Sequence, residues 1–343
     1  MGSLGKSSAY RLHCGMFPDM NFVVATHGHC FDGLASAVLF TRLVERLGPS
    51  QRGAPLEASY RACGYGNGQP RADERMLTAG ENAILDYRYH PTEKLTWYFD
   101  HHRTAFASDA DRAVFEARRS NGRFFFDDAC SSCTKLIAQV SRERFGIESP
   151  DLDELVAWAD RIDAARFESA AQAVDRSDPM MRLVSVVEHY GDDAFLEKFV
   201  PELLRRPLAE VAQSPEIAAR YRPLGKKHDR FVERVRESSL LQGRVVFVDL
   251  TAEVLESVGK FVTYALYPNS VYSVIVGLLK SGPKISVGYN PWSGRSLDAD
   301  ISSICARYGG GGHPVVGGIA FGSAEVERAR LVAREIAEEL SGA

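Results

Sequence analysis

The sequence predicts an α/β protein with an N-terminal, mostly parallel sheet flanked by helices, a helical linker, and a smaller C-terminal α/β domain. Three observations lead to this fold class. Short strand-like runs alternate with helix-like segments between Asn21 and Phe145, strand signals are missing from Leu152 to about Glu237, and they return after Gly243. Strands that alternate with helices are typical of a parallel sheet covered on both faces. We expect the first domain at 20–195, the linker at 196–240 and the second domain at 241–343.

The first strand, loop and helix form the clearest unit. Asn21 to Thr26 is a short apolar, β-branched run, which is typical of a buried strand. A glycine-containing loop follows from His27 to Gly33. Apolar residues at helical spacing then run from Leu34 to Leu47 and stop before Gly48, which predicts a helix.

The remaining elements follow from the same patterns. Further strands are predicted at 82–85, 95–99 and 123–126, and a helix at 133–145 with Ser131 or Ser132 as its N-cap. In the second half we expect a helix or helix pair at 214–237, strands at 245–250, 271–279 and 284–289, and helices at 299–308 and 324–340.

Composition limits the classes of function. The chain has 343 residues, is 45% hydrophobic and carries a formal net charge of −4, which is ordinary for a globular protein. An acidic total argues against a protein that coats nucleic acid, but metal ions can still attract a small anionic substrate. Apolar stretches are too short to span a membrane and the N-terminus lacks a signal-peptide pattern, so we expect a cytoplasmic protein. Six cysteines do not suggest a disulfide framework.

Aspartate and histidine residues follow the predicted strands. In open α/β sheets, ligands bind beyond the carboxyl ends of the strands. The loop after the first strand, the position after the second and the end of the third carry such residues, and a helical segment adds more; they are His27, His29, Asp32, Asp86, Asp100, His101, His102, Asp160 and Asp163. Each alone has an ordinary structural explanation, such as a helix cap, and only the joint pattern indicates a site.

Mixed oxygen and nitrogen ligands favour transition metals over Ca²⁺. About six ligands from four segments exceed what one tetrahedral ion needs, so we expect two divalent metal ions, with Mn²⁺ first and Co²⁺, Fe²⁺ or Zn²⁺ as alternatives. Two such ions can hold a bridging hydroxide and clamp a phosphoryl group. Asp86 is the candidate for the carboxylate shared between them.

The triplet Asp100, His101 and His102 resembles the signature of the DHH phosphoesterase superfamily. Its order relative to the loop at His27–Gly33, Asp86 and Asp163 strengthens the resemblance. Asp163, with an aromatic residue four positions later, is similar to the family's fourth motif, and Asp160 is the alternative.

This resemblance implies a DHH catalytic domain that hydrolyses a phosphodiester or phosphomonoester of a short oligonucleotide or nucleotide by a metal-bridging water. It implies the metal ligands His27, His29, Asp32, Asp86, His101 and Asp163. Asp100 would orient a metal-binding histidine, and His102 would contact the phosphate. Short RNA or DNA, cyclic or linear dinucleotides and pAp-like nucleotides are the expected substrates, and a homodimer is left open.

The first motif departs from the family pattern. The family has a histidine followed by two aspartates, and Asp32 fits the second of these. The position of the first aspartate falls at Cys30. We expect His29 to replace the missing carboxylate, with a Cys30 thiolate as the alternative. The resulting site would hold less negative charge and prefer Mg²⁺ less.

The C-terminal half carries a glycine run followed by a histidine. This segment resembles the glycine-rich motif of the family's second domain, DHHA1. The resemblance implies substrate binding by Arg295, Gly310, Gly311, Gly312 and His313, because glycines can present backbone N–H groups to an anion. A flexible glycine turn is the structural alternative.

Two other functions are kept open. The chain can be a pyrophosphate or polyphosphate phosphatase on the same scaffold. It can also be a nucleotide-binding regulatory protein that lost catalysis through the altered first motif. Metal content and turnover distinguish these cases.

Overall fold

The computed structural model describes residues 21–48, 57–64, 72–255, 259 and 261–342. They form two compact units, Met1–Arg166 with Arg182–Tyr221, and Phe167–Met181 with Arg222–Ala343. The predicted α/β fold class is confirmed in both. No helix within the described ranges has the length and apolar character needed to cross a membrane.

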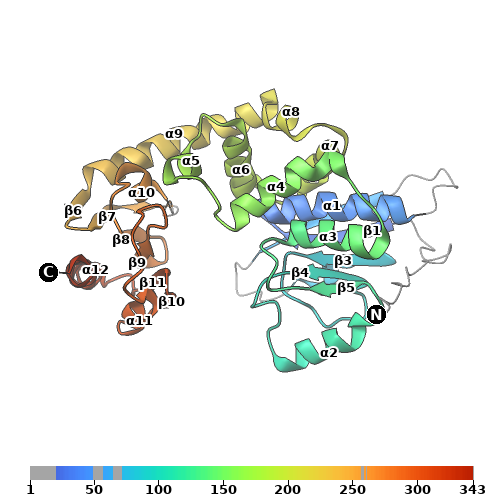
Figure 1. Ribbon diagram of the computed structural model, residues 1–343, viewed down its shortest axis with the longest axis horizontal. Helices are drawn as coiled ribbons and strands as arrows, with labels where there is room; N and C mark the ends of the chain where they lie inside the picture. The colour runs from blue at the N-terminus through green and yellow to red at the C-terminus, as the bar shows by residue number, and fades with distance from the viewer. Residues whose placement is uncertain (1–20, 49–56, 65–71, 256–258, 260, 343) are drawn as a thin grey trace, which may run out of the picture. The chain divides into compact units, whose positions relative to one another are not determined.

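A five-stranded parallel sheet forms the centre of the first unit (Figure 1). Its strand order is β2-β1-β3-β4-β5, so the first strand of the chain lies inside the sheet. The bounds are β1 Asn21–His27, β2 Glu57–Cys63, β3 Glu81–Leu85, β4 Trp97–Asp100 and β5 Phe124–Phe126. Every neighbouring pair is parallel, as the alternation of strands and helices predicts.

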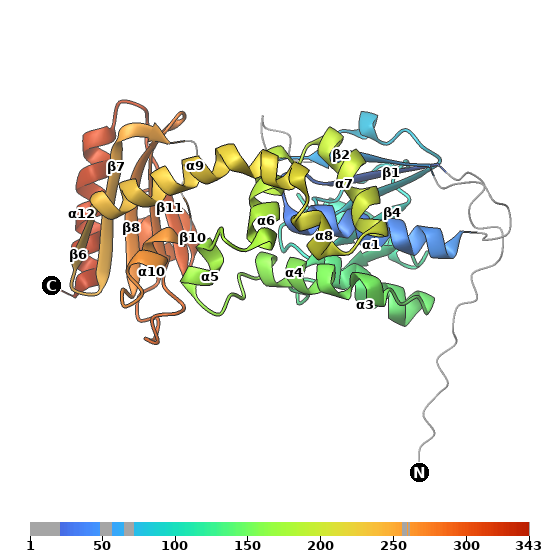
Figure 2. The ribbon, with the colours of Figure 1, turned by 90° about the horizontal axis from the view of Figure 1, so that it is seen from above.

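Helices lie on both faces of this sheet. Helices α1 (Phe31–Leu47), α3 (Cys133–Phe145) and α4 (Asp153–Asp163) pack together on one face (Figures 1 and 2). Helix α2 (Asp109–Arg119) lies on the other face (Figure 1). Residues 31–44 of α1 are buried without a break, because α3, α4 and α7 (Asp193–Arg205) surround it. Ser132 caps α3 by accepting the backbone N–H of Lys135, which confirms the predicted helix start.

The middle of the chain is helical, as predicted. Its helices are α5 Ala170–Val174, α6 Pro179–Tyr190, α7, α8 Leu208–Ala212 and α9 Pro215–Glu237. Helix α5 packs against α10 (Val262–Leu266) inside the second unit.

The second unit contains a six-stranded mixed sheet of order β10-β11-β9-β8-β7-β6. Its strands are β6 Ser239–Gln242, β7 Val245–Leu255, β8 Tyr272–Leu279, β9 Gly282–Tyr289, β10 Gly311–His313 and β11 Val316–Ala320. Only β7 and β8 pair in parallel. Helix α11 (Ile301–Ala306) lies against the β10–β11 hairpin.

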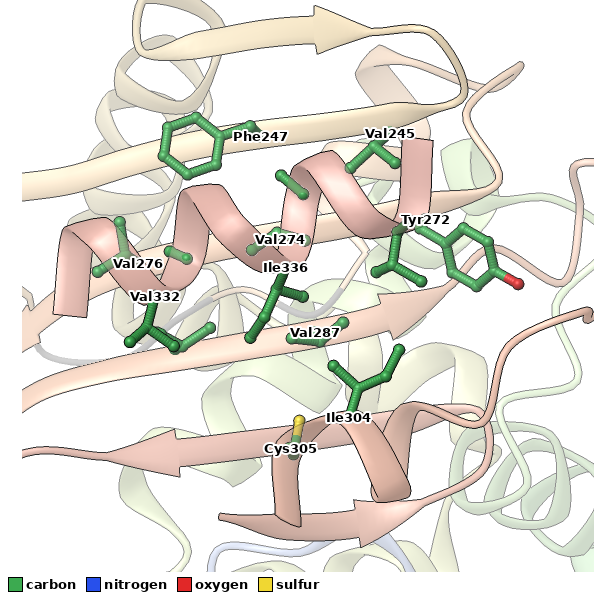
Figure 3. Close-up of a cluster of buried hydrophobic side chains, with 14 of the residues drawn as sticks. Val245, Phe247, Tyr272, Val274, Val276, Val287, Ile304, Cys305, Val332 and Ile336 are labelled. Carbon is green, nitrogen blue, oxygen red and sulfur yellow. The ribbon is translucent and has the colours of Figure 1, made fainter. Parts of the chain in front are cut away.

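The core of this unit lies between the sheet and α12 (Val326–Ser341). Val332 and Ile336 of α12 face the sheet residues Val274, Val276 and Val287 (Figure 3). Alternate residues of β8 and β9 point to this face, which is why strand periodicity places valines there. A second cluster on the sheet includes Val235 of α9 and Val262 of α10.

Candidate metal centre

The candidate site lies where β1, β3 and β4 end. In the parallel pairing, Thr26 is beside Leu85, and Leu85 is beside Phe99. The next residues therefore lie at the same edge of the sheet: His27 and Asp100 are the last residues of β1 and β4, and Asp86 directly follows β3. This is the edge at which the sequence places the ligand site.

Asp86 lies at the centre of the site. Its backbone has φ 54°, a left-handed conformation that costs about 1–3 kcal/mol for a residue other than glycine, and its N–H donates to the carbonyl of Phe99 at 2.9 Å. The side chain is buried and its two oxygens face different partners. Oδ2 lies 3.6 Å from His27 Nδ1, and Oδ1 lies 3.6 Å from His101 Nε2.

His101 has one ring nitrogen fixed by the protein. Its Nδ1 lies 3.1 Å from the carbonyl oxygen of Cys130 and therefore donates its proton there. The other nitrogen, Nε2, lies 3.3 Å from Asp163 Oδ2, 3.6 Å from Asp86 Oδ1 and 3.8 Å from Asp32 Oδ2. The ring thus presents Nε2 to three carboxylates, one just after β3, one in α1 and one at the end of α4.

Asp32 also holds two elements together. From the first turn of α1, its carboxylate accepts the backbone N–H groups of Cys133 at 2.7 Å and Thr134 at 3.0 Å, at the start of α3. The hydroxyl of Thr134 donates to the Asp32 carbonyl at 3.1 Å. These contacts fix the carboxylate on the side of the site that faces His101.

Asp100 positions the histidine pair. It is buried, and its Oδ1 accepts the backbone N–H groups of His101 at 2.8 Å and His102 at 3.1 Å. The same oxygen lies 2.8 Å from His102 Nδ1, and the Tyr98 hydroxyl donates to Oδ2 at 3.0 Å. His102 is thereby held with Nε2 left for a ligand, and 34% of its side chain is exposed.

Among the residues that the structure describes, three sets of side chains have potential ligand atoms within 4.8 Å of one another. We call His27, Cys30 and Asp86 the thiol cluster, and Asp32, His101 and Asp163 the carboxylate cluster; the third set is Asp86, His101 and His102. Asp86 Oδ1 and His101 Nε2 are buried and have no hydrogen-bond partner among the described residues, although they lie 3.6 Å apart. Because ligand bonds of about 2.0–2.2 Å separate the atoms around one ion by about 3–4 Å, these residues fit a divalent cation.

The charges of the site favour a cation as well. Burial and the nearby charge of Asp86 raise the pKa of Asp32 and of Asp163. Burial alone would lower the pKa of His101, but Asp86 and Asp32 outweigh it and raise that pKa. The carboxylates of Asp32, Asp86 and Asp163 thus lie close together, with Asp32 and Asp86 buried, and a divalent ion would offset their mutual repulsion.

No protein-family model and no curated protein sequence matches the chain. Solved structures do. A pGpG-specific phosphodiesterase, PggH, from Vibrio cholerae aligns over 92% of this chain and 98% of its own, with 19% sequence identity and a TM-score of 0.65. A DHH domain of a member of the s1p family of ribosomal proteins aligns over 94% and 86%, with 13% identity and a TM-score of 0.55. An exopolyphosphatase-related protein from Bacteroides fragilis aligns over 94% and 92%, with 14% identity and a TM-score of 0.50.

The chain therefore has the DHH fold. This confirms the fold that the triplet at Asp100 and the order of the motifs predict. The alignments extend over both units, so the likeness is not limited to the sheet that carries the triplet.

The structure places the alternative ligands of the first and fourth DHH motifs in different surroundings. Asp163 lies in the carboxylate cluster, whereas Asp160 accepts from Lys135 at 3.3 Å and Arg166 at 2.8 Å, outside all three sets. His29, the predicted replacement for the missing aspartate, belongs to none of these sets, whereas Cys30, the alternative, lies in the set with His27 and Asp86. The backbone of His29 is left-handed, with φ 56°, and its N–H donates to the carbonyl of Gly191 at 3.0 Å, a contact between residues far apart in the sequence.

In the DHHA1-like unit, the glycine motif forms a hairpin. Gly311 to His313 are β10, which pairs antiparallel with β11. A Cβ on Gly312, at φ 152°, would approach the carbonyl of Val316 to 2.2 Å, and one on Gly310 would approach that of Gly318 to 2.3 Å. Packing of the hairpin therefore requires glycine at these two positions, independently of any role in binding. His313 and Arg295 are exposed, and their binding of substrate stays a prediction.

Sequence patterns did not indicate the residues that support the DHH triplet. Tyr98 donates its hydroxyl to Asp100, and the Cys130 carbonyl orients His101. The alternation within β4 gives a partial signal, since Tyr98 and Asp100 are two residues apart and so share a face of the sheet. The Cys130 carbonyl gave no signal, because any residue type supplies one.

Proposed function

We propose that the chain is a divalent-metal-dependent phosphoesterase that hydrolyses a phosphodiester or phosphomonoester of a short oligonucleotide or nucleotide. The observation that supports this proposal is that the two oxygens of the Asp86 carboxylate face different histidines: Oδ2 faces His27 and Oδ1 faces His101. A carboxylate shared in this way suits two adjacent ions, and Asp32, His101 and Asp163 would hold the second. Bound there, such ions would activate a water molecule and offset the negative charge of a phosphoryl group.

His102 is the candidate proton donor next to this centre. Burial alone would lower the pKa of His102, but its hydrogen bond to Asp100 and the charge of that carboxylate raise it. When the ring is protonated, Nδ1–H is directed at Asp100 and the second proton is on Nε2. That proton can bind a phosphate oxygen and stabilise the charge that develops during hydrolysis.

The proposed substrate is a linear dinucleotide first, because the pGpG-specific phosphodiesterase has the same fold over nearly its whole length. Pyrophosphate and polyphosphate form the second candidate, which the exopolyphosphatase-related neighbour supports. Arg295, Gly310, Gly311, Gly312 and His313 remain our proposed substrate-binding residues, and a cytoplasmic location and a homodimer remain expectations.

The test is turnover with added Mn²⁺ of pGpG, a short RNA, a cyclic dinucleotide, pAp, pyrophosphate and polyphosphate. We expect hydrolysis of one nucleotide substrate that stops on chelation and in His101→Ala, while circular dichroism shows that this variant is folded. Turnover of pyrophosphate or polyphosphate alone would favour the second candidate. Nucleotide binding without turnover of any substrate would identify a regulatory binding protein and end the enzyme proposal.

A further inference from the structure

Cys30 occupies the N-cap position of α1 but does not cap the helix. Its backbone is extended, with φ −131° and ψ 133°, and its side chain makes no cap hydrogen bond. The Sγ atom points instead into the site, 3.7 Å from Asp86 Oδ2. A polar group at an N-cap usually accepts a backbone N–H of the first turn, so the thiol is directed elsewhere by the fold.

Three different donor atoms meet at this point. His27 Nδ1 lies 3.6 Å from the same Asp86 Oδ2 that Cys30 faces, and the three ligand atoms all lie within 4.8 Å of one another. Asp86 is buried, and its other oxygen has no hydrogen-bond partner among the described residues. The thiol cluster therefore offers nitrogen, sulfur and oxygen, whereas the carboxylate cluster offers two oxygens and one nitrogen.

We propose that Cys30 binds, as a thiolate, the metal ion that His27 and Asp86 hold, and that it sets the metal preference of that site. This inference rests on the proposed metal-dependent function. Thiolate ligands select soft or borderline ions such as Zn²⁺, Fe²⁺ and Co²⁺, while carboxylate and water suit Mg²⁺ and Mn²⁺. The two ion positions of this chain thus differ in chemistry, and the thiol cluster rejects Mg²⁺.

The competing account is that Cys30 only donates a weak hydrogen bond to Asp86. Its distance of 3.7 Å to Oδ2 suits such a bond. The two accounts differ in what an ion does, because a thiolate bound to cobalt absorbs light through sulfur-to-metal charge transfer and a thiol hydrogen bond does not.

The experiment is titration of the full-length apo chain with Co²⁺, with near-ultraviolet absorption and bound cobalt measured on the same samples. The variants are Cys30→Ser and Cys30→Asp, which replace sulfur by oxygen at the same position. The matched control is Cys133→Ala, since Cys133 is buried near the same aspartates but donates its thiol to the carbonyl of Phe99 at 3.3 Å. Circular dichroism checks that each variant is folded.

We expect a charge-transfer band in the wild type and in Cys133→Ala, and no band in either Cys30 variant. Cys30→Ser should also bind Co²⁺ at least about tenfold more weakly, since even groups that only support a ligand contribute about 10–100-fold. Cys30→Asp should keep bound cobalt and gain affinity for Mg²⁺ relative to Co²⁺.

Other results would overturn the inference in distinguishable ways. Bound cobalt without a band in the wild type, or a band that persists in both Cys30 variants, would remove the thiolate and leave the metal-dependent function intact. Absence of bound metal, together with hydrolysis that chelation does not affect, would remove both proposals.

Discussion

Asp100 Oδ1 lies 2.8 Å from His102 Nδ1 and accepts the backbone N–H groups of both histidines that follow it. One buried oxygen therefore fixes the direction of the ring and the path of the chain that carries it. The order of residues in the triplet has a geometric reason: the aspartate at the end of β4 is the support for the two histidines beyond it.

Replacement of Asp100 by asparagine should reduce kcat about 10–100-fold, a range typical of residues that orient a ligand or catalytic group. The amide can still accept hydrogen bonds from the backbone, but it no longer stabilises the protonated form of His102. The pH profile separates this from simple structural damage: the basic limb, which reports loss of the His102 proton, should move to lower pH. Asp128→Asn, at an exposed loop position, is the control, and an unchanged profile in Asp100→Asn would contradict the prediction.

Substitutions of Asp163 and Asp160 should have very different effects on turnover, although both residues lie on α4. Asp163→Asn removes an oxygen 3.3 Å from His101 Nε2 and should abolish metal-dependent turnover. Asp160→Asn removes only contacts with Ser131, Lys135 and Arg166, and should leave kcat within about twofold of wild type. Activity assays at saturating Mn²⁺ measure both, and a reversed result would reassign the ligand.

The same residue, Asp160, should contribute to acid sensitivity. Burial would raise its pKa, but hydrogen bonds from Ser131 and Lys135 outweigh it, so the pKa is lowered. Its stabilisation of about 1 kcal/mol is then fully present above the unfolded pKa, near 3.9, and is lost as the pH falls through the lowered folded value. The free energies of unfolding of wild type and Asp160→Asn, measured with urea, should therefore differ at pH 6 and converge below about pH 3. A difference that stays constant with pH would be evidence against this.

Gly33→Ala should destabilise the first unit. A Cβ at this position in the first turn of α1 would approach the His27 carbonyl oxygen to 2.1 Å, and neither backbone segment can move alone because Thr26 donates to the Gly33 carbonyl at 2.8 Å. We expect a loss of about 1–3 kcal/mol in the free energy of unfolding. Gly64→Ala, with open space around its Cβ, should change it by less than about 0.5 kcal/mol. Equal changes in the two variants would show that the backbone around His27 and Gly33 can move to accept the added methyl group.

Metal removal should lower the melting temperature. A divalent ion offsets the repulsion among Asp32, Asp86 and Asp163, and a ligand at 100 times its Kd stabilises the folded chain by about 2.7 kcal/mol. Scanning calorimetry with Mn²⁺ and with a chelator measures the difference, and Asp86→Asn should lose most of it. A wild-type melting temperature that changes neither with Mn²⁺ nor with the chelator would be incompatible with a metal centre at these residues.

Local patterns predict the strongly patterned elements well. The helix at Cys133–Phe145 has the predicted bounds, and β1 and β3 each begin or end within one residue of the expected runs. Strand β2 at Glu57–Cys63 was not predicted, because it is an edge strand with several polar, partly exposed residues and no apolar run. Hydrophobic periodicity identifies burial, and an edge strand has little of it.

The first motif shows the limit of predicting a site from residue types. His29 and Cys30 are neighbours and both are potential ligands, so composition does not separate them. Only the folded backbone places them differently: His29 is left-handed, and its N–H donates to the carbonyl of Gly191, far along the chain. That hydrogen bond is tertiary, and no property of the loop sequence reveals it.

The two clusters that share the edge of the sheet also differ in how early a growing polypeptide contains them. All members of the thiol cluster are synthesised by residue 86, whereas the carboxylate cluster lacks its last member until residue 163. A chain elongating from its N-terminus thus contains the complete sulfur-bearing set well before the oxygen-rich one.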